Sequence, residues 1–169
     1  MALTDVRRGI YSLNGADIPT NKSPVVAVHP YFNCGIVYTG RTGSGKQLII
    51  NPENPYIQNF EAIVRDRERP LITFEERSKV DLTAQRYEEL GRVERTFFVK
   101  TRDGWGIPLG LWKRWRDPMN FLREFGDNPI DVVGGGYDEE DKYRRCLGSV
   151  IRRLERFELP FTVLKEVTF

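Results

Sequence analysis

The sequence predicts an α/β fold: one three-layer domain with a mostly parallel sheet and helices on both faces. Short runs rich in Val, Ile and Phe alternate with segments whose apolar residues recur at helical spacing, as in βαβ units. The 169 residues are 40% hydrophobic and carry a net charge of +2, which is typical of a folded domain and not of a disordered chain. We expect an N-terminal arm (1–23) and a single domain (24–169) that carries a β-hairpin.

The arm is expected to begin with a short helix over residues 4–13. Thr4 is a suitable N-cap, and Asn14-Gly15 ends the pattern. Residues 1–8 lack the apolar core of a secretory signal, and no apolar run approaches the ~20 residues that a membrane-spanning helix needs. We therefore expect a soluble, cytoplasmic protein without a membrane partner.

After a buried type of strand over 25–28, two β-rich runs (35–39 and 46–50) flank a glycine-rich tip. The string over 40–46 matches the G-x-x-x-x-G-K pattern of phosphate-binding loops. That pattern continues with Ser or Thr and a helix, whereas here Gln47 follows and Pro52 prevents a helix from propagating. The two runs therefore predict a β-hairpin, and anion binding at its tip stays an open question.

From residue 56 onward, helical and strand patterns alternate to the end of the chain. Apolar residues three or four positions apart mark the helices, and short β-branched or aromatic runs mark the strands. In order, we expect a helix over 56–64, a strand over 71–74, a helix over 82–90, a strand over 93–100, helical turns over 109–115, a helix that begins at 117, a strand over 130–133, a helix over 138–157 and a strand over 161–164.

The turn after the strand over 130–133 is a candidate ligand site. The strand runs into Gly134, Gly135 and Gly136, and Asp138 opens the next helix. Ligands of α/β proteins bind at the carboxyl ends of parallel strands, and glycines let the backbone approach them closely. The acidic run over 138–141 would repel phosphate, so we expect a neutral or cationic ligand group, or a metal held by the acids. The alternative is a purely structural, well-capped turn.

Three segments of the second half also carry a family resemblance. Residues 97–101 (FFVKT), 131–135 (DVVGG) and 146–147 (CL), followed by a last strand, resemble isochorismatase-like cysteine hydrolases. The resemblance implies hydrolysis, with Lys100 and Cys146 in the catalytic positions. From the order of the elements we expect the ligand site near Lys100, Asp103 and residues 134–138, and we expect no cofactor. The sequence departs from the family in two places: His29 and its neighbours stand where the family has an Asp, and Cys146 is expected well inside a helix and not at its start.

The cysteines and the single histidine also have simpler interpretations, as core residues without a catalytic role. A lone Cys on the apolar face of a helix, such as Cys146, is typically a small core residue. His29 and Cys34 lie five residues apart and could form a base and nucleophile pair, but no third residue orients the imidazole. We favour a packed His29 at the end of a strand. One histidine also excludes metal sites built from several histidines, and we expect no metal.

Cations and aromatic residues alternate over 111–116. Trp112, Arg114, Trp115 and Arg116 could stack on bases and pair with phosphates, pack partly into the core, or anchor a protein interface. Dedicated nucleic-acid binders carry a strong basic excess, and this chain does not. We therefore favour core packing combined with a protein interface.

Two classes of function follow from these patterns. The first is a small-molecule or nucleotide-type ligand-binding domain, which the family resemblance makes a hydrolase. The second is a non-enzymatic subunit of a larger assembly that uses three contacts: the arm, the hairpin tip and residues 111–116, which we call the Trp–Arg strip. Protein partners or self-association are expected in the second case.

Overall fold

The computed structural model describes residues 3–7, 9–16, 18–31, 36–39, 45–101, 112–135, 138–141, 143 and 146–168; at 7, 36–39, 45–47 and 112–116 it describes the backbone alone. Strands and helices alternate along most of this described part, as expected. In chain order they are β1 (Thr4–Arg7), β2 (Ile10–Ser12), β3 (Val25–Val28), β4 (Ile36–Thr39), β5 (Gly45–Leu48), α1 (Pro55–Arg65), β6 (Leu71–Glu76), α2 (Val80–Glu89), β7 (Thr96–Thr101), α3 (Trp112–Arg123), β8 (Ile130–Gly134), α4 (Cys146–Arg156) and β9 (Phe161–Thr168).

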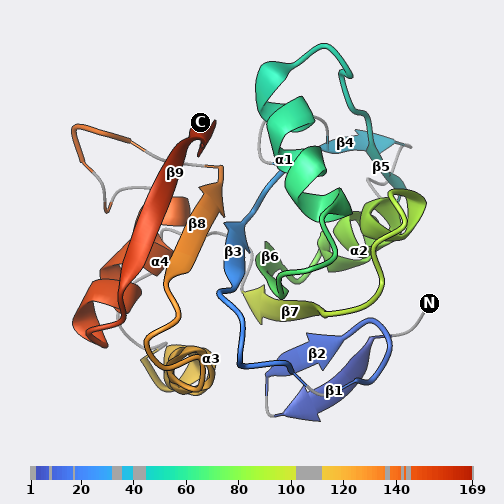
Figure 1. The fold of residues 1–169 in the computed structure, drawn as a ribbon. Coiled ribbons are helices and arrows are strands. Elements are labelled where there is room, and N and C mark those ends of the chain that lie inside the picture. The colour runs from blue at the N-terminus through green and yellow to red at the C-terminus, as the bar shows by residue number, and fades with distance from the viewer. Residues whose placement is uncertain are drawn as a thin grey trace.

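A seven-stranded sheet in the order β1-β2-β7-β6-β3-β8-β9 forms the centre of the fold (Figure 1). The five strands from β7 to β9 in that order are parallel, so the prediction of an α/β fold with a mostly parallel sheet is confirmed. The chain passes from β3 outward to β6 and β7, and then returns to the other side of β3 to form β8 and β9. The direction of winding therefore reverses between β3 and β8.

Two apolar clusters form because successive side chains of a strand point to opposite faces of the sheet. Val26 and Val28 of β3 belong to a cluster with buried residues of α3 and α4. Val25 and Ala27, which alternate with them, belong to a second cluster with buried residues of α1 and α2. All four β3 residues are fully or almost fully buried, which explains why this strand is a continuous apolar run.

The start of the chain differs from the expected helix, because residues 4–12 form strands β1 and β2. β2 pairs antiparallel with β7, with Ile10 opposite Val99. Ile10 and Ser12 are buried and Tyr11 is half-buried, the alternation of a strand with one face towards the core. Gly9, with φ of 81°, lies between the two strands, where few other residues adopt that conformation. Pairing with the open edge of β7 outweighs the local preference for a helix.

The last helix also differs, since residues 138–141 and 143 are not helical and the described helix α4 spans Cys146–Arg156. The side chain of Asp138 accepts hydrogen bonds from the backbone N–H groups of Glu140 (3.0 Å) and Asp141 (3.4 Å). Such local bonds favour turns over helix. One consequence concerns the family resemblance: Cys146 lies in the first described turn of α4 and not deep inside a helix that starts at residue 138.

The expected hairpin is present as a separate two-stranded sheet of β4 and β5, with Ile36 opposite Leu48. Lys46 lies in strand β5, which confirms that the phosphate-loop pattern is not followed by a helix. The tip over 40–44 lies outside the described residues. None of the described helices combines the length and apolarity needed to cross a membrane.

Candidate functional site at the carboxyl edge of the sheet

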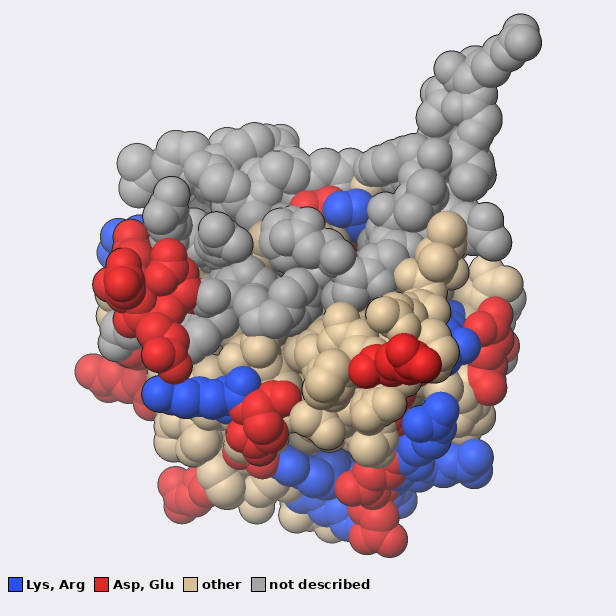
Figure 2. All heavy atoms as spheres, turned by 90° about the horizontal axis from the view of Figure 1, so that it is seen from above, with Lys and Arg blue, Asp and Glu red and all other residues tan. Residues whose placement is uncertain are grey.

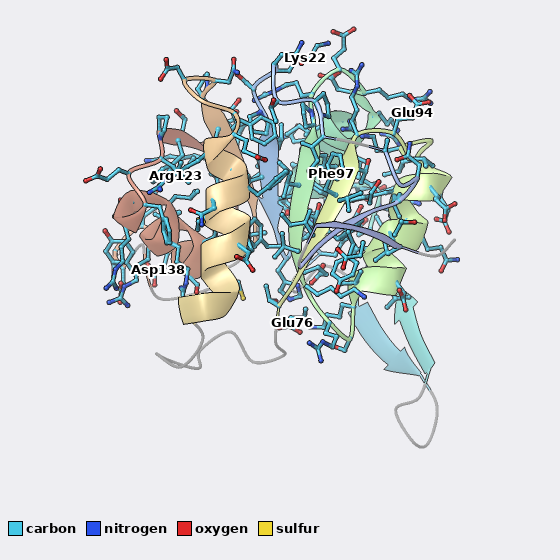
Figure 3. All side chains as sticks on the ribbon, turned by 90° about the horizontal axis from the view of Figure 1, so that it is seen from below. Lys22, Glu76, Glu94, Phe97, Arg123 and Asp138 are labelled. Atoms are coloured by element: carbon cyan, nitrogen blue, oxygen red, sulfur yellow. The ribbon has the colours of Figure 1, made fainter. Side chains whose placement is uncertain are left out.

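Chemically reactive side chains gather where the parallel strands end. Figure 3 shows this edge at the end of the sheet where Glu76 is labelled, opposite the end that carries Lys22 and Glu94. In α/β sheets the ligand crevice lies outside the carboxyl ends, at the point where the winding reverses. Here that point is the pair β3 and β8, and the residues at or just after the strand ends are His29, Glu75, Glu76, Lys100, Thr101 and Gly134.

His29 and Glu75 form a buried pair. The Nδ1 atom of His29 lies 2.5 Å from Oε1 of Glu75, and both side chains are inaccessible to solvent. Oε1 also accepts the backbone N–H of Glu76 (2.9 Å), and Oε2 accepts the hydroxyl of Thr83 from α2 (2.9 Å). These three contacts supply the partners that a buried carboxylate needs. A structural role, as expected for His29, and a functional role both fit this pair.

The backbone at the reversal point is unusual on both strands. His29 has φ of 40°, a left-handed conformation that is uncommon outside glycine and that clusters at functional sites. Gly134 has φ of 133°, and a Cβ built there would lie 2.1 Å from the carbonyl oxygen of Val28. The N–H of Gly135 donates to that same oxygen (2.9 Å). The glycines therefore serve the close approach of β8 to β3.

Cys146 lies at the same edge, on the α4 side. Its side chain is 7% exposed. Burial, followed by the negative charge of Glu76 and more weakly that of Glu75, raises the pKa of the Cys146 thiol to about 12, while the Lys79 ammonium counteracts this. Lys79 pairs with Glu76, with 2.8 Å between Nζ and Oε2. A thiol, a carboxylate and an ammonium are thus close enough to influence one another.

The remaining predicted site residues have different outcomes. Lys100 is exposed at the end of β7, with its ammonium 4.4 Å from the centre of the Tyr11 ring. It is in register with Glu75, whereas its neighbour Thr101 is in register with Glu76. Because side chains alternate along a strand, Lys100 and Thr101 point to opposite faces of the sheet. Asp103 and Gly136 lie outside the described residues.

Sequence reasoning overlooked Glu75, Glu76 and Lys79. The signal was available: a Glu-Glu pair directly follows the buried strand residue Phe74. Carboxylates at the carboxyl end of a parallel strand are candidates for a ligand site. They were hidden because Glu75 and Glu76 are the last residues of β6 and look like the polar boundary of a strand.

The Trp–Arg strip begins helix α3, but the side chains of Trp112, Arg114, Trp115 and Arg116 lie outside the description, so their predicted interface stays a prediction. Farther along α3, an apolar face packs into the first cluster through Met119, Phe121, Leu122 and Phe125. On the face shown in Figure 2, acidic and basic side chains lie next to one another across the described surface. Among the described residues, no group of three or more His, Cys, Asp or Glu side chains could hold a metal ion.

Comparisons with known proteins complete the description of the site. No family model, no curated protein and no solved structure matches this chain.

Proposed function

We propose that the chain binds a small molecule at the carboxyl edge of its sheet and hydrolyses an acyl bond in it, with Cys146 as the nucleophile. One observation carries the proposal: the thiol in the first described turn of α4 has Glu76 and Lys79 as charged neighbours, beside the point where the winding reverses. A cysteine nucleophile needs a nearby base and benefits from a helix N-terminus. The position of Cys146 in the first described turn of α4 also supports the resemblance to isochorismatase-like hydrolases.

In the proposed reaction, Glu76 moves the proton. The resting thiol is protonated, because its pKa is raised to about 12. When the substrate binds, the thiol proton passes to the Glu76 carboxylate and the sulfur attacks the acyl carbon. Glu76 then protonates the leaving amine as the carbon–nitrogen bond breaks. Water hydrolyses the resulting thioester, giving one proton to Glu76, which returns it to the departing sulfur.

The surroundings favour a neutral or cationic substrate group. Asp138 and the acids that follow it come four residues after the end of β8, and Lys165 of β9 pairs with Glu139 across 3.2 Å. Fixed carboxylates disfavour a further negative charge nearby. Small amides with a neutral or positively charged substituent are therefore the substrates we propose.

The two apolar clusters on alternating strand residues support the three-layer arrangement, and an arm boundary near residue 23 stays a prediction.

The test is turnover of a panel of small amides and nucleotides, together with thermal stabilisation by each compound. We expect Cys146→Ser and Glu76→Gln to abolish turnover of any amide that stabilises the protein. Lys79→Met and Lys100→Met compare the two candidate cations: a larger loss in Lys79→Met supports Lys79 beside Glu76, and a larger loss in Lys100→Met supports the role implied by the family resemblance. Turnover that survives Cys146→Ser contradicts the mechanism.

A second candidate function is that of an assembly subunit. The observation that favours it lies at the hairpin: Ile49, just after β5, is 51% exposed. Beside it, a groove of about 560 Å³ runs between this segment and α2, lined by Leu48, Ile50, Pro52, Leu82, Gln85, Arg86 and Glu89. A large mass in solution that falls on Ile49→Glu, with no ligand stabilising the protein, would favour this candidate over the hydrolase.

A further inference from the structure

The side chain of Glu75 contacts the backbone of Glu76, the proposed base. The two residues are adjacent in β6, and their side chains point to opposite faces of the sheet. Glu75 turns its carboxylate back so that Oε1 accepts the N–H of Glu76 itself (2.9 Å). The Glu75 carboxylate therefore holds the backbone N–H of Glu76 at the point where strand β6 ends. This contact restrains the backbone from which the Glu76 side chain extends.

Two residues from other elements hold the Glu75 carboxylate in turn. His29, just after β3, contacts Oε1 through Nδ1 at 2.5 Å, and the hydroxyl of Thr83 in α2 donates to Oε2 at 2.9 Å. The side chains of His29, Glu75 and Thr83 are all fully buried. Their geometry is thus fixed by β3, β6 and α2 together, and Lys79, the partner of Glu76, is the N-cap residue just before α2.

We propose that Glu75, held by His29 and Thr83, is a positioning residue that keeps the Glu76 carboxylate beside Cys146. The inference rests on the proposed function for its biological meaning, but not for its test. Outer partners that orient a reacting group are a general device of catalytic sites. In this chain the device uses a buried His–Glu pair at the reversal point, where the backbone of His29 is left-handed.

The test is the rate at which iodoacetamide alkylates Cys146 at pH 9, followed by peptide mass spectrometry so that Cys34 is counted separately. Below the thiol pKa, each unit by which that pKa falls raises the thiolate fraction about tenfold. Glu75→Gln removes one charge but keeps an oxygen for the N–H of Glu76. Glu75→Leu removes the charge and the acceptor. If Glu75 positions Glu76, alkylation accelerates in Glu75→Gln and accelerates further, by about tenfold or more, in Glu75→Leu.

Thr73→Val is the matched control. Thr73 is buried on the same strand and the same face, and its hydroxyl contacts that of Tyr87 (2.8 Å) without touching Glu76. We expect it to lower stability but leave the alkylation rate of the folded protein unchanged. Equal rates in Glu75→Gln and Glu75→Leu would overturn the positioning role, because charge alone would then explain both. If Glu75→Leu does not fold, Thr83→Val must accelerate alkylation and Thr83→Ser must restore the original rate.

This outcome is separate from that of the proposed function. The alkylation rates need no substrate, so positioning can fail while hydrolysis by Cys146 stands. Conversely, the predicted order of rates can hold in a protein whose Cys146→Ser variant keeps its turnover, which would leave the geometry intact and remove the hydrolase proposal.

Discussion

The two edges of the sheet use charged side chains in different ways. At the amino edge, Arg92 is 1% exposed and donates to the backbone carbonyls of Asp66, Arg69 (2.5 Å) and Arg95 (3.2 Å). Arg69 likewise donates to the carbonyl of Ser23 at 2.8 Å, and it also pairs with the Asp131 carboxylate at 2.8 Å. At the carboxyl edge, charged side chains meet other side chains: His29 with Glu75, and Lys79 with Glu76. At the amino edge, the guanidinium groups that bind carbonyls hold loops together. At the carboxyl edge, the carboxylates near the Cys146 thiol can accept and donate protons.

The largest effect on stability should come from Arg92. Arg92→Leu removes the guanidinium from three part-buried contacts with backbone carbonyls and from a buried contact with the Thr96 hydroxyl, at a cost of roughly 3 kcal/mol or more. Urea unfolding measures the loss. Turnover per folded molecule should stay unchanged, and a variant that is stable but inactive would contradict the division between the two edges.

Gly134→Ala should cost about 2–3 kcal/mol in the free energy of unfolding, because a Cβ would collide with the backbone of β3. Gly126→Ala is the matched control: Gly126 also has positive φ (61°) but open space around it, so only the backbone cost of about 1 kcal/mol remains. Equal losses in the two variants would show that the close approach at the reversal point is unimportant.

The pH dependence of stability should reveal the buried thiol. Its pKa is about 12 in the folded protein and about 9 when unfolded, so the unfolded chain releases the proton first and stability falls as pH rises from about 9 towards 12. Comparing wild type with Cys146→Ala isolates this part, which amounts to about 1 kcal/mol per pH unit within that window. Identical pH profiles of the two proteins would contradict the burial of Cys146 beside carboxylates.

The smallest effect is expected at the surface of the amino edge. Lys22 and Glu68 lie 3.8 Å apart, and both are well exposed. Lys22→Met should change the free energy of unfolding by less than about 0.5 kcal/mol, as measured by urea unfolding in low salt. A larger change would mean that the amino edge depends on more than the carbonyl contacts of Arg92 and its neighbouring arginines.

The fold was accessible to sequence reasoning where local pattern and tertiary environment agree. The continuous apolar run of β3 predicts a buried strand, and the periodic apolar face of α4 predicts a helix. Residues 4–12 do not, because their strands depend on the open edge of β7, which no local pattern reveals. The start of α4 was predicted too early for a different reason. The Asp138 side chain accepts the backbone N–H of Glu140, and this local hydrogen bond favours a turn where the sequence pattern predicts helix.

The candidate site was less accessible, since its residues come from distant parts of the chain. Cys146 could be picked out by type, but its neighbours Glu76 and Lys79 are brought to it only by the order of the strands. His29 and Glu75 are 46 positions apart, and nothing in the sequence pairs them. Strand order is set by how all the helices pack, which a single sequence does not display.

Mass spectrometry of an acid-quenched reaction tests the central claim most directly. The protein is incubated with each amide that stabilises it, and the intact mass and the Cys146 peptide are measured. The account predicts an added acyl group on Cys146 in the wild-type protein and none in Cys146→Ser, with turnover lost in that variant. Turnover without an adduct, persisting in Cys146→Ser, would contradict it.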